Sequence, residues 1–599
     1  MQQTTTEKML NLKINGKILQ AKEEETILDV ARRNNIHIPT LCYHDDLCLS
    51  GICRVCVVEV EGQRLLQTAC NTPVFEGMVV NTNSQQVRKA RKMIIELLLS
   101  EHVGDCTTCK RNLNCELQEL ASKYGIEEVS FKKPEEKRFP VEEDNSPIVR
   151  DNDKCILCRR CIRVCEEIQG VDAITPVGRG KDTSIGCLFD LGLDETICVF
   201  CGQCINRCPT GALSERDATK DVWKAIEDPT KHVVVQTAPA IRAALAEEFD
   251  VPPGERVTAK MASALKMIGF DTVFDTDFTA DLTIIEEGTE LLTRLKKALV
   301  DKSDVAIPMF TSCSPGWINY IEHNYPDLLP NLSTCKSPQQ MFGALIKTYY
   351  AEKQGIDPDN IVSVSVMPCT AKKYEADRPE MTDSGHKDVD YVLTTRELAR
   401  MIKQAGLDLM ELEDAEFDAP MGISTGAGVI FGATGGVMEA AIRTAYELVT
   451  GREVPFDNLN IQPVRSMEGI RAASITITDP LPEWSFLDGV EVKVAVAHTL
   501  SNAKKLMDRV RAGEAPYHFI EVMACPGGCL GGGGQPIPTA PDIRKKRAEA
   551  IYTEDGEMKL RKSHENPAVK QLYDEFLGEP NGHKSHELLH THYTEKSNW

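Results

Sequence analysis

The pattern of apolar and polar positions divides the chain into two parts. After residue 216, apolar runs such as VVVQTAPAI (233–241), IVSVSVMPC (361–369) and VKVAVAH (492–498) predict buried strands. Between them, SPQQMFGALIKTYYAEKQ (337–354) and TTRELARMIKQAG (394–406) have the period of amphipathic helices. Because strands and helices alternate, we expect an α/β architecture there. Before residue 216, cysteine motifs interrupt the apolar positions, which indicates smaller domains.

Short-range signals in the first part add detail. LNLKINGKILQAKEEETILDVARRN (10–34) fits a β-hairpin followed by a helix, and the charged, turn-rich EEKRFPVEEDNSPIVRDND (135–153) predicts a linker. We find no run of about 18 apolar residues, so we expect no membrane span. The start, MQQTTTEKMLNLKING (1–16), lacks the charged-then-apolar layout of a signal peptide, which favours a cytoplasmic protein.

The composition is that of a large acidic protein. A chain of 599 residues is too long for one core and predicts roughly three to five domains. The net charge of −22 argues against a nucleic-acid-binding protein, which normally presents a basic face. The 22 cysteines change the picture most, because clustered cysteines in a reducing compartment are more often metal ligands than disulfides.

The first cysteine group surrounds a long loop, CYHDDLCLSGICRVCVVEV (42–60). Its candidate ligands are Cys42, Cys53, Cys56 and Cys70. A C-x2-C pair with more distant partners is related to the plant-type ferredoxin spacing, so we predict one [2Fe–2S] cluster. A zinc ribbon uses the same residue type and is the alternative. Cys48 lies in the same loop and is left out of this set.

The second group lies in HVGDCTTCKRNLNC (102–115) and has the spacing H-x3-C-x2-C-x5-C. Its candidate ligands are His102, Cys106, Cys109 and Cys115. We predict a [4Fe–4S] cluster, although one histidine and three cysteines also form a legitimate zinc set. A neutral imidazole in place of a thiolate should raise the reduction potential of the cluster.

A repeated motif follows, CILCRRCIRVC (155–165) and CVFCGQCINRCP (198–209). Each copy reads C-x2-C-x2-C-x3-C, the run of bacterial two-cluster ferredoxins, in which the fourth cysteine serves the other cluster. The predicted ligands of one [4Fe–4S] cluster are Cys155, Cys158, Cys161 and Cys208. Those of the other are Cys198, Cys201, Cys204 and Cys165. Clusters in such number serve to move electrons.

Three segments of the second part carry further chemistry: FTSCSPGW (310–317), VMPCTAKKYEADRP (366–379) and the glycine-rich EVMACPGGCLGGGGQP (521–536). They offer four thiols, those of Cys313, Cys369, Cys525 and Cys529. Four thiolates from three loops would hold one more cubane, and the glycines would leave room beside it. Lys372 would supply a cation to an anionic group in that space. Buried structural cysteines are the alternative.

These three segments resemble the three signature loops of iron-only (FeFe) hydrogenases. STGAGVIFGATGGVMEAA (424–441) and RKSHENPAVKQLYDEFLG (561–578) also resemble the family, as does the order of the N-terminal cluster motifs. The resemblance covers essentially the whole chain. It implies an α/β catalytic domain that carries the H-cluster, preceded by small α+β iron–sulfur domains. We expect a plant-type ferredoxin-like domain at 1–84, a His/Cys cluster domain at 85–140, a two-cluster ferredoxin-like domain at 141–216 and the catalytic domain at 217–599.

The resemblance also implies roles at the H-cluster, a [4Fe–4S] cubane bridged by a thiolate to a two-iron unit with CO, cyanide and an azadithiolate. Cys529 matches the bridging cysteine, and Cys369 and Cys525 match cubane ligands. Lys372 matches a lysine that donates to a cyanide, where a charge-assisted hydrogen bond is strong. The residues that match the packing of the two-iron unit are Met367 and Met523.

The first loop departs from the family, which usually reads Thr-Ser-Cys-Cys-Pro. Here Ser314 takes the place of the second cysteine, the family's cubane ligand, while Cys313 matches the cysteine that passes protons. Because iron in a cubane prefers thiolate, our hypothesis is that Cys313 becomes the ligand and Ser314 exchanges protons. The alternative keeps Cys313 as the proton relay, with Ser314 or water on iron.

Proton delivery needs a series of exchangeable groups. By resemblance these include Glu287, Glu290 and Ser333. Carboxylates three residues apart share one face of a helix, which agrees with such a path. A solvated acidic face is the alternative in a chain with this many glutamates.

The resemblance implies reversible oxidation of H2, with electrons relayed through three further [4Fe–4S] clusters and one [2Fe–2S] cluster. GATGG (432–436) is not a dinucleotide fingerprint, so a pyridine nucleotide would need another subunit to bind it. The chain resembles the catalytic subunit of multimeric NAD(P)-linked or electron-bifurcating hydrogenases, which implies flavin/NAD(P)-binding and [2Fe–2S] partner subunits, or ferredoxin. The alternatives are an electron-transfer subunit of an NADH dehydrogenase-like complex and an H2 sensor. Cys187 and Cys335 receive no role.

Overall fold

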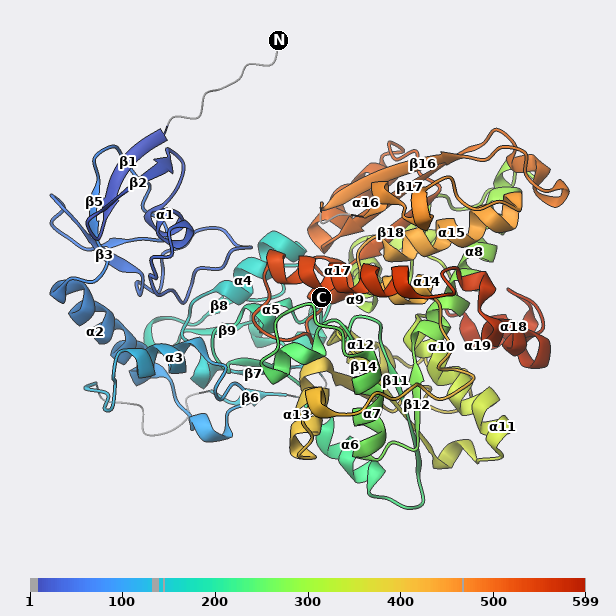
Figure 1. The fold of residues 1–599 in the computed structure, drawn as a ribbon, viewed down its shortest axis with the longest axis horizontal. Coiled ribbons are helices and arrows are strands. Elements are labelled where there is room, and N and C mark those ends of the chain that lie inside the picture. Colours follow the sequence, from blue (N-terminus) through green and yellow to red (C-terminus); the bar gives the residue numbers. More distant parts are fainter. Residues whose placement is uncertain (1–8, 132–138, 144–145, 466–467, 598–599) are drawn as a thin grey trace, which may run out of the picture.

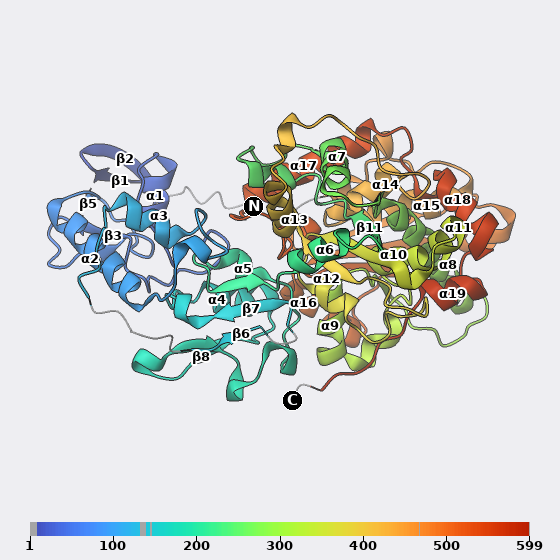
Figure 2. The ribbon, with the colours of Figure 1, turned by 90° about the horizontal axis from the view of Figure 1, so that it is seen from below.

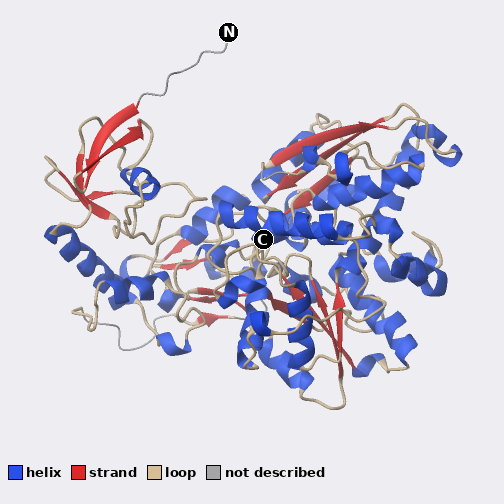
Figure 3. Ribbon diagram, viewed as in Figure 1, coloured by secondary structure: helices blue, strands red, loops and turns tan. Residues whose placement is uncertain are grey.

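The computed structural model describes residues 9–131, 139–143, 146–465 and 468–597. Figure 1 shows the N-terminal part, in blue to cyan, beside a larger domain in green to red, and the perpendicular view of Figure 2 separates the two parts in the same way. Strands run through both parts, and helices surround the strands of the larger domain (Figure 3). This confirms the predicted fold class. Within the described ranges, no helix is long and apolar enough to cross a bilayer.

The first domain is a five-stranded sheet with one helix against it. The predicted hairpin is confirmed: β1 (Met9–Ile14) pairs antiparallel with β2 (Lys17–Lys22), and α1 (Ile27–Arg33) follows. Asn15 and Gly16 both have positive φ, the conformation that a two-residue hairpin turn requires. The remaining strands are β3 (Val57–Val60), β4 (Gln67–Thr68) and β5 (Val79–Asn81), in the order β2-β1-β5-β3-β4.

The next two domains are smaller. The second is built on α2 (Gln85–Glu101) and α3 (Glu116–Lys123). The third has one short helix in each cysteine repeat, α4 (Arg160–Arg163) and α5 (Gln203–Arg207), and its sheets contain β6 (Val141–Glu142), β7 (Ile148–Asp151), β8 (Thr175–Val177), β9 (Ser184–Gly186) and β10 (Leu213–Glu215).

The linker prediction for residues 135–153 is wrong in its second half. β7 pairs antiparallel with both β6 and β10, and Ile148 is buried. This segment is therefore an integral strand of the third domain, because its apolar residues have a partner strand that lies far along the chain. Residues 135–138 and 144–145 of the predicted linker lie outside the described residues.

The large domain contains two four-stranded sheets. The first has the order β12-β11-β14-β15 and is wholly parallel; its strands are β11 (His232–Thr237), β12 (Thr272–Asp275), β14 (Ile361–Met367) and β15 (Tyr391–Thr394). The second has the order β13-β18-β17-β16; its strands are β13 (Met309–Phe310), β16 (Ile470–Thr476), β17 (Glu491–His498) and β18 (Phe519–Met523). Only β16 is antiparallel to its neighbour. The three strands predicted from apolar runs are thus confirmed as β11, β14 and β17.

Helices cover both sheets. The predicted helix at 337–354 is a continuous run of α10 (Pro338–Leu345), a π-helical turn and α11 (Ala351–Gln354), and the one at 394–406 is α13 (Thr395–Gln404). Three helices matter below: α8 (Asp277–Leu299), α15 (Gly436–Thr450) and α17 (Pro541–Glu557).

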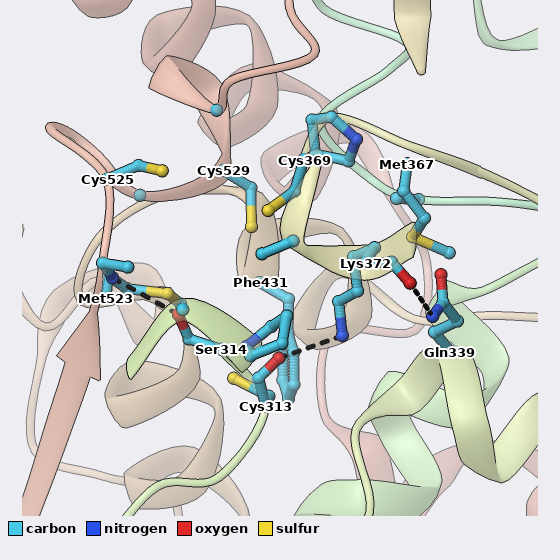
Figure 4. Close-up of a pocket in the computed structure, with 18 of the residues that line it drawn as sticks. Cys313, Ser314, Gln339, Met367, Cys369, Lys372, Phe431, Met523, Cys525 and Cys529 are labelled. Carbon is cyan, nitrogen blue, oxygen red and sulfur yellow. Dashed lines mark hydrogen bonds between the residues drawn. The ribbon is translucent and has the colours of Figure 1, made fainter. Parts of the chain in front are cut away.

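The candidate loops follow from this topology. The segment with Cys313 leaves β13, the segment with Cys369 leaves β14, and the glycine-rich segment leaves β18. Residues that follow all three strands line one cavity (Figure 4), and ligand sites in open parallel sheets commonly lie at the carboxyl ends of the strands.

Candidate active site and cluster-binding sites

A cavity, partly open to solvent, lies at these strand ends, with about 760 Å³ of free space between the atoms. Figure 4 shows the side chains that border it. Those with sulfur, nitrogen or hydroxyl groups include Cys313, Ser314, Gln339, Met367, Cys369, Lys372, Met523, Cys525 and Cys529. The structure therefore brings together every residue that the three sequence segments nominated for this site.

Three of the thiols share one region of the cavity. In Figure 4 the sulfur atoms of Cys369 and Cys529 lie near each other, with Cys525 on the same side. Burial, followed by the charge of Cys369, raises the pKa of Cys529 to about 12, and the same two influences raise the pKa of Cys525 well above its usual value. These thiols would stay neutral without a cation beside them.

The two neighbours in the first loop face different groups. Ser314 Oγ accepts a hydrogen bond of 3.3 Å from the backbone N–H of Ala524, the residue before Cys525. The pKa of the Cys313 thiol is raised well above its usual value by burial and then by the nearby charge of Glu287 on α8. Ser314 thus lies with the segment that carries the other thiols, whereas Cys313 lies toward Glu287.

Lys372 supplies a buried cation at the border of the cavity. Its Nζ donates to the Cys313 carbonyl at 3.1 Å and to Glu375 Oε2 at 2.8 Å. Gln339 Nε2 donates to the Lys372 carbonyl at 3.2 Å and to Glu375 Oε2 at 3.0 Å. Glu375 therefore balances the lysine charge, and Gln339 fixes both residues.

The sequence did not point to three residues of this site. Gln339 and Phe431 line the cavity, and Glu375 pairs with Lys372. Glu375 had a usable signal, because residues three apart on a helix are neighbours and Lys372 and Glu375 both lie on α12 (Ala371–Ala376). Gln339 and Phe431 had none, since only the tertiary fold brings α10 and the segment before α15 to the cavity.

The glycine-rich segment has a second task besides leaving room. A Cβ at Gly533 would lie 2.2 Å from the Cys201 carbonyl oxygen, and one at Gly532 would lie 2.1 Å from the Pro368 carbonyl oxygen. Gly532 also lines the cavity, but Gly533 does not. Part of the glycine run therefore exists to let the backbone press against the third domain.

The two cysteine repeats are crossed, as their spacing predicts. One cavity, of about 540 Å³, is lined by Cys165, Cys198, Cys201 and Cys204. Another, of about 380 Å³, is lined by Cys155, Cys158, Cys161 and Cys208. In each cavity the fourth cysteine comes from the other repeat. Cys201 also borders the large cavity, so the first of these sites adjoins it.

The first domain gathers its four cysteines in a buried group. Cys42, Cys53, Cys56 and Cys70 are each at most 8% exposed. Hydrogen bonds from the Cys53 and Cys70 thiols hold the pKa of Cys42 well below its usual value. Cys48 stays outside this group; it is exposed, and its Sγ donates to Glu167 Oε1 at 2.6 Å.

The second domain presents its four candidate ligands between two helices. His102 follows α2, Cys106 starts a short 3-10 turn (Cys106–Thr108), and Cys115 caps α3. A Cβ at Gly211 would lie only 2.4 Å from Cys109 Sγ, so this loop presses on the chain that follows Cys208. The second and third domains therefore place their cysteine loops side by side.

The predicted proton-transfer residues also meet. Burial and then the charge of Glu290 raise the pKa of Glu287 to about 8. Ser333 and the backbone of Ser312 lie next to the Glu287 carboxyl and partly offset this rise of its pKa, and Ser333 Oγ donates to Glu290 Oε2 at 3.1 Å. Glu287 is 3% exposed, so this is not a solvated acidic face.

Five family models match along the chain. Residues 231–533 match the iron only hydrogenase large subunit, C-terminal domain, and 541–596 match the iron hydrogenase small subunit. Residues 7–85 match a 2Fe-2S iron-sulfur cluster binding domain, 91–130 the NADH-ubiquinone oxidoreductase-G iron-sulfur binding region, and 146–214 the ferredoxin-like domain of NADH-quinone oxidoreductase subunit 3.

Relatives that match over nearly the whole chain are also named as hydrogenases. The chain is 50% identical over 591 residues to the NADP-reducing hydrogenase subunit HndD of Solidesulfovibrio fructosivorans, covering 98% of this chain and 99% of that protein. It is 43% identical over 592 residues to iron hydrogenase 1 of Clostridium pasteurianum, covering 98% and 100%. A solved variant of [FeFe]-hydrogenase HydA1 from Chlamydomonas reinhardtii is 48% identical, with a TM-score of 0.57, and covers 64% of this chain and 100% of that one.

The chain therefore belongs to the iron-only hydrogenase family. It is an enzyme of that class, a hydrogenase whose H-cluster domain is preceded by domains that bind [2Fe–2S] and [4Fe–4S] clusters.

Proposed function

We propose that this chain is the catalytic subunit of a hydrogenase that reversibly oxidises H2, 2H+ + 2e− ⇌ H2, in the 760 Å³ cavity. The observation that carries the proposal is the combination of three thiols and one ammonium group around a single space at the strand ends. When bound there, an H-cluster supplies the two-electron chemistry of H2, while the protein positions and isolates it.

The residues of the cavity fit such a group. Because burial keeps the thiols of Cys525 and Cys529 protonated, a nearby iron cation is what would make them thiolates. Cys369 and Cys525 would hold the cubane, and Cys529 would bridge to the two-iron unit. Lys372 is placed to donate to an anionic ligand such as cyanide. Two further side chains, Met367 and Met523, would pack against it.

The geometry supports the second of the two assignments for the first loop. Ser314 lies beside the residue that precedes Cys525, so we assign it the fourth corner of the cubane, directly or through water. Cys313 lies toward Glu287, so we assign it to proton transfer. The thiolate preference of iron favoured the reverse, but a side chain can serve as a ligand only from the side of the cavity where the other ligands are.

Protons would pass between Cys313 and the outside through Glu287, Ser333 and Glu290. A carboxyl with a pKa of about 8 holds its proton at neutral pH and can release it to a neighbour, as proton transfer near neutral pH requires. Ser333 relays by its hydroxyl, which accepts one proton while giving up another. This order of residues follows the contacts of Glu287 and Glu290, both on α8, with Ser333.

Electrons would travel through the crossed pair of [4Fe–4S] clusters to the His/Cys3 [4Fe–4S] cluster and the [2Fe–2S] cluster. The site that contains Cys201 adjoins the active-site cavity. Asp46 of the first domain pairs with Arg207 of the third domain at 2.8 Å and with Arg544 of the catalytic domain at 3.0 Å, so the first domain contacts both. A relative named as the subunit of an NADP-reducing hydrogenase supports delivery to a flavin/NAD(P)-binding partner subunit; ferredoxin is the other acceptor.

The test is H2-dependent reduction of methyl viologen by anaerobically matured protein, with electrons counted per H2 consumed. Uptake with two electrons per H2 is the expected result. Protein with full iron content and no H2 uptake would contradict the proposal and favour an electron-transfer subunit.

A further inference from the structure

Helix α8 carries another buried carboxylate, next to Glu287 in sequence, which the path above does not use. Glu286 is fully buried, and its Oε2 lies 3.2 Å from Nε2 of His590. Its Oε1 accepts a hydrogen bond from the Tyr573 hydroxyl. His590 follows α19 (His583–Leu589), so this contact joins the C-terminal segment to the centre of α8.

His590 is also connected to the proton-transfer residues. Its Nδ1 lies 2.7 Å from Thr334 Oγ1, and that hydroxyl lies 3.2 Å from Glu290 Oε2. The backbone N–H of Thr334 donates to the same carboxylate oxygen at 3.0 Å. An unbroken series of hydrogen bonds therefore runs from Glu290 through Thr334 and His590 to Glu286.

The hydrogen-bond partners of Glu290 differ in what they can pass on. Its Oε1 binds Arg294 at 2.6 Å, but a guanidinium keeps its proton in proteins and cannot pass one on. The Oε2 side is bound by Ser333 and Thr334, and of these only Thr334 leads away from Glu287.

His590 also has an exposed neighbour. The ring of His586 lies 4.2 Å from that of His590, centroid to centroid. His590 itself is only 6% exposed. Histidine is the side chain best suited to accept and release protons at neutral pH.

We propose that His590 is a proton-transfer residue of this hydrogenase, forming with Thr334 a branch through which protons move between Glu290 and the buried Glu286, beside the exposed His586. In one step, protonated Glu290 gives its proton to Thr334 Oγ1, the Thr334 hydroxyl proton passes to Nδ1 of His590, and the Nε2 proton passes to ionised Glu286. Each group gains and loses one proton, so the net result is transfer from Glu290 to Glu286. The reverse order serves H2 formation.

Within the part of the chain that the structure describes, no other side chain is hydrogen-bonded to both Thr334 and Glu286. The titratable and charged side chains described near His590 include Glu286, Glu290, Arg294, Cys335, Tyr573 and His586. Among them Cys335 lies 4.0 Å from Glu290 Oε2, and burial raises the pKa of its thiol well above the usual value. A neutral thiol of that kind does not compete with the imidazole.

The branch rests on the proposed function, and its test has one readout that depends on turnover and one that does not. We would compare His590→Gln and Thr334→Val with two matched controls. Thr334→Ser keeps the hydroxyl and is the conservative variant, and His583→Gln changes an exposed histidine of the same segment. H2 oxidation at saturating H2 and methyl viologen would be measured in H2O and in D2O.

We expect His590→Gln and Thr334→Val to lower the rate by about tenfold, less than the effect of a group that acts at the reacting atoms. The solvent isotope effect should rise at the same time, because proton transfer becomes limiting, whereas a structural defect would lower both rates equally. His583→Gln should match the parent, and Thr334→Ser should recover most of the rate that Thr334→Val loses. Unchanged rates and isotope effects in both His590→Gln and Thr334→Val, at normal iron content, would overturn the branch.

The second readout uses protein without the two-iron unit, labelled with ¹⁵N-histidine. The Nδ1 resonance that disappears in His590→Gln should move in Thr334→Val and stay in place in Thr334→Ser. If this resonance does not move in Thr334→Val, the hydrogen bond between Thr334 and His590 is refuted, even if the parent protein oxidises H2. Absence of H2 uptake by the parent, with the link present, would instead refute the proposed function.

Discussion

The crossed cysteine repeats and the active-site cavity both gather four potential iron ligands, yet they are built differently. The repeats draw every ligand from two short motifs, and each set of four cysteines encloses a cavity of about 540 or 380 Å³. The proposed active site draws its candidate ligands from three loops at the ends of two sheets, includes a serine among the cysteines, and has about 760 Å³ of free space, part of it open to solvent, bordered by a lysine.

The difference shows what each site is for. A site that only carries electrons needs four thiolates and a close fit, which a local motif supplies. A site that also binds a second group needs extra volume, a cation such as Lys372 and access for protons, and these come from elements distant in the sequence. The variants below test whether the two kinds of site respond differently.

Replacing the bridging cysteine should separate the sites most sharply. In Cys529→Ser we expect H2 oxidation to fall by at least about 10³-fold, because the residue is proposed to touch the reacting group itself, while the crossed clusters keep their iron. Viologen reduction and the iron count per chain would be measured together. Cys187→Ser, a buried cysteine outside both sites, should change neither quantity. Loss of iron from the crossed clusters in Cys529→Ser would contradict the independence of the two kinds of site.

The first loop offers a reciprocal pair of variants. Cys313→Ala should keep the cubane iron and lose about 10²-fold in rate, as expected when a proton-transfer group is removed. Ser314→Ala should do the opposite and weaken the cubane signal in electron paramagnetic resonance. If Cys313→Ala loses the cubane and Ser314→Ala keeps it, the thiol is the ligand and our assignment is reversed.

The pH dependence of turnover should move in a predictable direction. Burial and then the charge of Glu290 raise the pKa of Glu287 to about 8, so Glu287 keeps its proton until the pH rises through that value. Glu290→Gln removes the like charge, so the alkaline limb of the rate profile should shift to lower pH by about one unit. The exposed Glu549→Gln is the control and should leave the limb in place. A shift to higher pH would exclude this coupling.

The smallest effect concerns the glycine that presses on the third domain. In Gly533→Ala the new Cβ would meet the Cys201 carbonyl oxygen at 2.2 Å, so we expect unfolding free energy to fall by about 1–3 kcal/mol. Gly556, on α17, has nothing within 4 Å of the corresponding position, and Gly556→Ala should raise stability by up to about 1 kcal/mol. Anaerobic denaturant unfolding measures both. Equal effects in the two variants would mean that the close approach is not important.

Sequence reasoning was most successful where function is local. The crossed pairing of Cys165 and Cys208 follows from motif spacing alone, and the structure lines one cavity with each predicted set. The strands β11, β14 and β17 follow from apolar runs long enough to be buried. The catalytic domain could be interpreted in detail only because three short segments resemble a known family.

What the sequence could not supply is relative position. Nothing in the order of residues says that Ser314 lies beside Ala524 while Cys313 lies toward Glu287, because this depends on how two sheets meet. Gln339 and His590 were missed for the same reason, since each reaches its site from a helix or segment distant in the chain. The linker prediction failed because the partner strand β10 lies more than sixty residues away.

If the proposed function is right, the cavity holds an H-cluster that works on H2. Infrared spectroscopy of anaerobically matured protein, first under argon and then under H2, would detect it. We predict bands in the CO and cyanide region that shift when H2 is admitted. Protein with full iron content and no such bands would contradict the claim, and would leave the chain as a carrier of electrons alone.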